Sequence, residues 1–243
     1  MCIRDRLDPS CAKPLRDLAS LLNGIPAARL FDEFGKLFQA GHALRTFRLL
    51  REHELFGHLF PATEAWLGDA SDGRRLEFVE QGLRNTDERV ERDMSVTPMF
   101  MFAVLLWGPV HDRAWYFAEH ESMSGVQALI AAAAEVTAAQ TSRISLPKRF
   151  SFPMREIMQM QPRFDQRKGR RAAALLAHRR FRAAYDLMLL RGLLGEVESE
   201  TADYWTKLQA LPEHQKEQEL TPRRRRKTRG GRRRSAKKTN KNS

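Results

Sequence analysis

The end of the chain carries an unusual concentration of side chains that bind phosphate. Residues 223–243 contain eight Arg and four Lys, and no Asp or Glu. The formal net charge of the whole chain is +12, so residues 1–222 are formally neutral and the entire excess lies in this tail. Guanidinium groups fork onto phosphate oxygens, and a flexible chain can follow an irregular backbone. The composition therefore predicts a polyanion-binding tail, with RNA as the expected partner.

Two other roles are compatible with the tail. It could be a solvated extension that only aids solubility, or it could be attracted to acidic lipids. If about six of its charges neutralised phosphates on a single strand, the logarithm of the binding constant would fall with log[salt] at a slope of about −4. The tail residues expected to bind RNA are Arg223, Arg224, Arg225, Arg226, Lys227, Arg229, Arg232, Arg233 and Arg234.

A second basic region is interleaved with Phe150, Phe152 and Phe164. Basic groups with aromatic neighbours can hold a nucleic-acid backbone and stack unpaired bases. The alternative is a solvated helix face with its phenylalanines in the core, and the sequence leaves both interpretations open. The residues expected to bind RNA in this region are Lys148, Arg149, Arg163, Arg167, Lys168, Arg170 and Arg171.

Residue patterns that support catalysis or metal binding are missing. The seven histidines show no spacing such as His-Glu-x-x-His, and there is no glycine-rich phosphate loop or nucleophile elbow. Asp69 and Asp72 lie in a glycine-containing stretch that is typical of turns. We therefore predict no catalytic residue, no metal ligand and no cofactor held by this chain.

The cysteine content and the lengths of the apolar runs indicate the cellular compartment of the protein. Cys2 and Cys11 cannot form a disulfide framework, so we expect a reducing cytoplasm. The longest apolar run, residues 99–107, is far shorter than the ~18 to 20 residues needed to span a bilayer. Residues 1–6 resemble a translated sequencing adapter rather than protein, so we expect the natural chain to continue upstream.

Helical periodicity is the dominant pattern in the rest of the chain. From Leu30, apolar residues follow at i+1, i+4, i+7 and i+8, which is one face of a helix, and Pro26 suits its first turn. No segment alternates as a strand would, so the predicted fold is all-α, a multi-helix bundle followed by a disordered basic tail. Further helices are expected at residues 44–55, 74–92, 97–108, 110–120, 123–141, 151–161, 167–177, 178–193 and 200–210.

Several segments resemble, in order and spacing, the bacterial poly(A) polymerases of the class II nucleotidyltransferase superfamily. The most extensive is LLNGIPAARLFDE at residues 21–33, and the resemblance covers about residues 7–191. It implies neck helices at 7–67 and a helical RNA-binding body at 74–212. The remaining residues, 213–243, are almost without apolar side chains, so we expect them to form a disordered tail. The other segments are 55–61, NTD at 85–87 with Arg89, 98–107, 144 with PKRF at 147–150, QMQ at 159–161 with Arg163, and FRAAYD at 181–186 with Leu190 and Arg191.

The resemblance implies transfer of AMP from ATP to RNA 3′ ends, in mRNA processing and decay. The family uses two Mg²⁺ ions held by head-domain carboxylates, and its Gly-Ser and Asp-x-Asp head motifs do not occur in this sequence. We therefore expect the chain to bind RNA without adding nucleotides, and to meet protein partners from RNA decay. The alternatives are a CCA-adding tRNA nucleotidyltransferase and a freestanding helical RNA-binding module.

The resemblance also assigns a role to Arg29 and Glu33, on the neck helix that buttresses the nucleotide pocket. Their spacing of four residues also suits a simple ion pair within one helix, and the sequence leaves both roles open. Arg182 and Asp186 share this spacing. Their neighbours Phe181 and Tyr185 are expected in the core, which indicates that this segment is scaffold.

Overall fold

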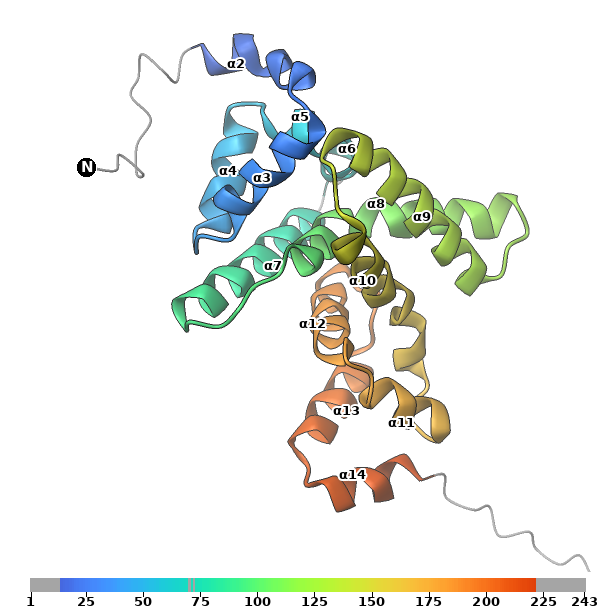
Figure 1. Ribbon diagram of the computed structural model, residues 1–243. Coiled ribbons are helices and arrows are strands. Elements are labelled where there is room, and N and C mark those ends of the chain that lie inside the picture. Colours follow the sequence, from blue (N-terminus) through green and yellow to red (C-terminus); the bar gives the residue numbers. More distant parts are fainter. Residues whose placement is uncertain (1–13, 70, 72, 222–243) are drawn as a thin grey trace, which may run out of the picture.

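The computed structural model describes residues 14–69, 71 and 73–221, and every regular element in this part of the chain is a helix (Figure 1). The all-α prediction is therefore confirmed. No helix within these ranges is long and apolar enough to cross a membrane. Residues 1–6 and the tail residues from Arg223 onward lie outside the described residues, as does Asp72.

The helix α8 (Pro98–His120) lies at the centre of the molecule. Twelve of its 23 residues are buried, including the continuous run 101–108. A helix that is apolar on all sides must be surrounded by other elements. Five helices pack against α8: α6 (Pro61–Gly68), α7 (Arg74–Glu91), α9 (Gly125–Arg143), α10 (Lys148–Gln159) and α12 (Phe181–Arg191).

The N-terminal helices share the core of α8. Phe34 places its ring centroid 4.4 Å from that of Phe102 and 4.6 Å from that of Phe38. The predicted apolar face is confirmed for Leu30, Phe34 and Phe38, which are buried, whereas Leu37 is 40% exposed. These helices are α2 (Leu15–Leu18), the 3₁₀ helix η1 (Ala19–Gly24), α3 (Ala27–Phe38), α4 (Ala43–Glu52) and α5 (Phe56–Leu59).

Polar contacts tie α9 to the N-terminal helices. The buried Gln140 amide donates to the Leu59 carbonyl at 2.9 Å, and the Arg143 guanidinium donates to the neighbouring carbonyl of His58. The Ser145 amide, just beyond α9, donates to the Ala27 carbonyl at 3.0 Å. The parts predicted as neck and body thus share both a hydrophobic core and a set of fixed hydrogen bonds.

The predicted break at Pro109 is wrong, because α8 runs through this residue without interruption. Proline has no N–H and therefore leaves the carbonyl four residues earlier, that of Leu105, without its helical donor. The Thr63 hydroxyl of α6 donates to this carbonyl at 2.7 Å, and Thr63 is fully buried. A side chain from another helix thus replaces the missing backbone donor.

The C-terminal elements lie at the opposite end of the molecule from α2 (Figure 1). Residues 213–220 were expected in the disordered tail, but they form a helix whose Leu220 is only 7% exposed. The Gly169 amide donates to the Leu220 carbonyl at 2.7 Å, so one apolar side chain and one hydrogen bond hold this otherwise polar helix. The elements are η2 (Gln161–Asp165), α11 (Arg170–Leu176), η3 (Gly192–Leu194), α13 (Ser199–Ala210) and α14 (Glu213–Leu220).

Replacing Thr63 by Val should leave the Leu105 carbonyl without a donor in the core. We expect the free energy of unfolding to fall by about 1 to 3 kcal/mol, measured by urea denaturation. In a Pro109→Ala background the N–H of residue 109 can serve this carbonyl, so Thr63→Val should cost clearly less. An equal loss in both backgrounds would contradict the role assigned to the hydroxyl.

Gly108 offers a second test of how tightly α8 is enclosed. A Cβ at this position would overlap the indole ring of Trp66, whereas a Cβ at Gly68 would meet nothing within 4 Å. Although alanine is the better helix former, Gly108→Ala should destabilise the protein by about 1 to 3 kcal/mol through overpacking. Gly68→Ala, the matched control, should leave the thermal unfolding midpoint unchanged or slightly raised.

Candidate nucleic-acid interface

The structure divides the predicted basic region of residues 148–171 into two groups. Lys148 and Arg149 lie in the first turn of α10, beside the N-terminal helices, where the Phe150 ring centroid is 5.8 Å from that of Phe31. The remaining predicted residues follow the other end of α10. Twelve helical residues span about 18 Å, so the two groups do not form one continuous patch.

The second group consists of cations around the loop that joins η2 to α11. Arg163, Lys168, Arg170 and Arg171 are exposed. Arg167 is different, because its guanidinium donates to the Glu200 carboxylate at 2.8 Å and its carbonyl accepts the Tyr204 hydroxyl. Arg167 thus holds the loop against α13, and its predicted RNA contact would compete with an existing partner. Among the described residues, Arg163, Lys168 and Arg170 have no such side-chain partner, and Arg171 has only a 3.5 Å hydrogen bond to the Gln166 amide oxygen.

The second group also lies beside the point where the described chain ends. The hydrogen bond from Gly169 to Leu220 places the end of α14 next to Lys168, and Thr221 is the last described residue. Figure 1 shows α11 and α14 together at this end of the molecule.

Only one of the three interleaved phenylalanines is accessible for base stacking. Phe164 is 1% exposed and packs edge-on against Trp205, with ring centroids 5.4 Å apart, and Phe150 packs against Phe31. Phe152 is 51% exposed, with the guanidinium carbon of Arg155 5.0 Å from its ring centroid. The core interpretation therefore holds for Phe150 and Phe164, and the stacking interpretation can apply only to Phe152.

Glu33 takes a different ion-pair partner from the one its spacing indicated. Its carboxylate accepts from Lys36 at 2.8 Å, and this hydrogen bond lowers the pKa of the Glu33 carboxyl below its ordinary value. Arg29 is exposed and acts on Glu33 only through a weaker charge interaction. Glu33 is also the single charged residue lining an apolar groove of about 390 Å³. The nucleotide-pocket role of Arg29 and Glu33 stays a prediction.

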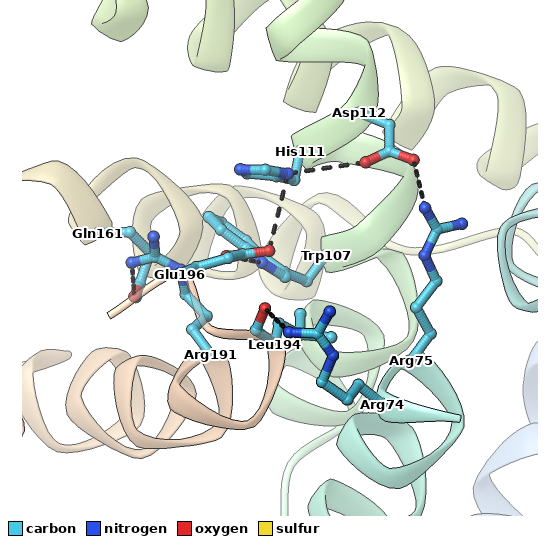
Figure 2. Close-up of polar contacts among 9 residues, drawn as sticks. All are labelled: Arg74, Arg75, Trp107, His111, Asp112, Gln161, Arg191, Leu194 and Glu196. Carbon is cyan, nitrogen blue, oxygen red and sulfur yellow. Dashed lines mark hydrogen bonds and ion pairs between the residues drawn. The ribbon is translucent and has the colours of Figure 1, made fainter. Parts of the chain in front are cut away.

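A partly buried polar network that the sequence did not reveal surrounds Glu196 (Figure 2). The Glu196 carboxylate accepts from the Trp107 indole N–H at 3.0 Å and from the Arg191 Nε at 2.9 Å. The Arg191 guanidinium also donates to the Gln161 amide oxygen at 3.2 Å and lies over the Trp107 ring, 4.7 Å from its centroid. The network joins α8, η2 and α12.

An acidic group beside a histidine invites a catalytic interpretation of this network. The His111 Nδ1 lies 3.7 Å from the Glu196 carboxylate and 3.6 Å from that of Asp112. These separations are too long for hydrogen bonds, and Glu196 is already occupied by Trp107 and Arg191. The geometry therefore supports a structural role that fixes the turn after α12. No group of three or more metal-binding side chains occurs in the described residues.

A further set of arginines was missed by sequence reasoning. Arg89 and Arg92, at the end of α7, line a cavity of about 400 Å³ together with Arg179, Arg180 and Arg182, at the start of α12. The only local indication was the density of arginine in residues 179–182. The partners from α7 could not be inferred, because only the packing of α7 against α12 brings them close.

Two family models match the chain. The first, described as "Polymerase A arginine-rich C-terminus", matches residues 121–240, and the second, described as "Probable RNA and SrmB- binding site of polymerase A", matches residues 6–67. The first range contains all the cations of the second basic group. The second contains the N-terminal helices from α2 to α6.

Curated relatives agree with these matches. Poly(A) polymerase I of Escherichia coli O6:H1 is 38% identical over 232 residues, which cover 90% of this chain and 49% of the relative. The enzyme of Salmonella typhi is 37% identical over 233 residues, covering 91% and 50%, and that of Haemophilus influenzae is 33% identical over 213 residues, covering 87% and 47%. The chain thus spans about half the length of these relatives, and it belongs to the bacterial poly(A) polymerase family as its C-terminal region.

Proposed function

We propose that this chain is the RNA-holding part of an enzyme that adds AMP from ATP to RNA 3′ ends, in mRNA processing and decay. The chain spans about half the length of the relatives it matches. Nucleotide transfer with ATP and Mg²⁺ is accordingly a property we propose for the longer protein. For the residues in hand we propose binding alone, in the cytoplasm.

The observation that carries this proposal is the position of the exposed cations. Lys168 and Arg170 flank Gly169, which donates to the Leu220 carbonyl near the place where the described chain ends, directly before the arginine-rich sequence. Arg171 follows in α11, and Arg163 lies in η2, which packs against α11. The family model for the arginine-rich C-terminus covers both segments. Arginine and lysine concentrated in one region raise the local concentration of phosphate-bearing strands and bind them through their charge.

We also propose that the N-terminal helices contribute to binding. The family model that matches residues 6–67 is described as a binding site for RNA and SrmB. Lys148 and Arg149 lie beside these helices, so an RNA strand could contact both. A protein partner from RNA decay would meet the same end of the molecule.

The metal chemistry of the family does not fit the described residues. Two-metal transfer needs carboxylates clustered around the ions, and no group of three or more potential metal ligands occurs in the described ranges. We derive no catalytic step on this chain. The matched family models and relatives are all named as polymerase A or poly(A) polymerase, which favours this enzyme over a CCA-adding enzyme. The chain aligns with about half of each relative, which argues against a freestanding module.

Deleting residues 222–243 should weaken binding to single-stranded RNA and reduce its dependence on salt. If about six tail charges contact phosphates, the slope of log K against log[salt] should become less negative by about 4. Fluorescence anisotropy with a labelled oligonucleotide measures both quantities. A tail of the same composition in scrambled order is the control, and it should bind like the natural one. Unchanged affinity and slope after deletion would rule out a role for the tail.

Incubation of this chain with ATP, Mg²⁺ and an RNA primer should give no extension. The physical reason is that the described residues hold no carboxylate cluster for two metal ions. Denaturing gel electrophoresis of a labelled primer detects the addition of a single nucleotide. A full-length poly(A) polymerase from one of the relatives serves as the positive control. Extension by the chain alone would contradict the proposed division of binding and catalysis.

A further inference from the structure

A further basic site is formed where α7 meets α12. It is the cavity of about 400 Å³ between the C-terminal end of α7, residues 92–97 and the start of α12. Its lining residues between 85 and 100 fall outside both matched ranges, 6–67 and 121–240, whereas its lining residues between 179 and 186 fall within the second of them. Five arginines and two carboxylates line the cavity.

The rim formed by residues 92–97 is held in place by backbone contacts. Asp93 adopts a left-handed conformation with φ of 55°, which reverses the chain after α7. The Met94 amide donates to the Arg89 carbonyl at 2.9 Å, and the Gln39 side chain donates to the Val96 carbonyl at 3.0 Å. The cavity is therefore bounded by a fixed turn.

The arginines differ in how firmly they are held. Arg180 is mostly buried and donates to the Glu156 carboxylate at 3.3 Å and to the Met99 sulfur at 3.4 Å. Arg179 and Arg182 have side chains 74% and 68% exposed. Their ion pairs lie at 3.9 Å to Glu156 and 3.0 Å to Asp186, and these carboxylates are 41% and 22% exposed. Arg179 can therefore turn toward a ligand at little cost, because Glu156 keeps its pair with Arg180. Arg182 can contact a ligand from the position that it holds beside Asp186.

The charge of the cavity favours an anion. Its five guanidinium groups face the carboxylates of Glu88 and Asp186, with Glu156 just outside the lining. Burial raises the pKa of the Asp186 carboxyl, although Arg182 partly opposes this effect. The cavity lining therefore carries more positive than negative charge. Burial also disfavours the charged form of Asp186, which is the least exposed of these carboxylates.

Part of the cavity lining is apolar. Val96, Met99 and Phe100 are half-buried and line the cavity beside the arginines. Pockets for small ligands have volumes of about 300 to 1,000 Å³ and combine apolar walls with a few polar groups. A base joined to a phosphate presents this same combination, whereas a peptide of acidic residues alone has no group that would cover the apolar lining.

We propose that this cavity binds one nucleotide of a single-stranded RNA, with its phosphodiester on Arg179 and Arg182 and its base against Met99 and Phe100. The inference rests on the proposed RNA-binding function and adds a site to it. Arginine suits this role because its planar fork matches phosphate oxygens and can stack on a base. The site would hold the strand between the N-terminal helices and the basic end of the molecule.

The test compares two double variants of the full 243-residue chain. R179Q/R182Q removes two exposed cations from the cavity, and R84Q/R113Q removes two cations that have side-chain partners, do not line the cavity and lie outside both matched ranges. With a fluorescein-labelled 15-nucleotide oligo(A), R179Q/R182Q should weaken binding about tenfold. It should also make the salt slope less negative by about 1.4, as expected for two lost phosphate contacts. R84Q/R113Q should change the affinity less than twofold.

A second measurement locates the base and separates loss of binding from loss of folding. An oligonucleotide carrying 4-thiouridine should crosslink to residues 94–100 in the wild-type chain and not in R179Q/R182Q. Both variants are checked by urea denaturation. If R179Q/R182Q is destabilised, R179K/R182K is measured in its place. This variant keeps both positive charges but lacks the planar guanidinium groups, so it should bind with intermediate affinity.

Each outcome has a distinct meaning. If wild type binds oligo(A) while R179Q/R182Q behaves like R84Q/R113Q and no crosslink forms at 94–100, the cavity site is overturned and the proposed RNA binding stands. If wild type shows no salt-dependent RNA binding, the proposed function fails and the cavity site fails with it. A poly-glutamate peptide that binds as tightly as RNA, with the same sensitivity to R179Q/R182Q, would replace the nucleotide by an acidic peptide.

Discussion

The central constraint on this structure is that the N-terminal half of α8 has to be covered on every side. Its run of buried residues from 101 to 108 has no polar face that could meet solvent, so helices from the first and the last third of the chain must meet around it. The same constraint explains the buried polar contact. A proline in an enclosed helix leaves a carbonyl that water cannot reach, and only a donor from a packed neighbour, here Thr63, can satisfy it.

The packing around α8 also determines where the positive charge lies. Because α10 packs along α8, its two ends carry basic residues to different regions of the molecule, Lys148 and Arg149 to one and Arg163 to Arg171 to the other. Because α7 and α12 also pack together, arginines from both line one cavity. The described cations therefore form several separate groups, rather than the one continuous basic region that the pattern of residues 148–171 indicated.

The predictions made from local pattern succeeded or failed for physical reasons that can be named. Helical periodicity identified the buried face of α3 because Leu30, Phe34 and Phe38 recur at the helical repeat. It failed at Pro109, where Thr63, 46 positions away, replaces the missing donor. It failed again at residues 213–220, because one buried leucine and a hydrogen bond from Gly169 stabilise a segment with almost no apolar residues.

The sequence alone determined the properties that are sums over residues or that follow from local patterns. These include the helical class, the neutral charge of residues 1–222 beside a basic tail, and the family to which the ordered motifs belong. Only the tertiary structure decided which side chains are accessible and which come together. It buried Phe164 and left Phe152 exposed, engaged Arg167 with Glu200, and placed Arg89 beside Arg182. The reason is that exposure and proximity depend on contacts between residues far apart in the chain, which no local spacing specifies.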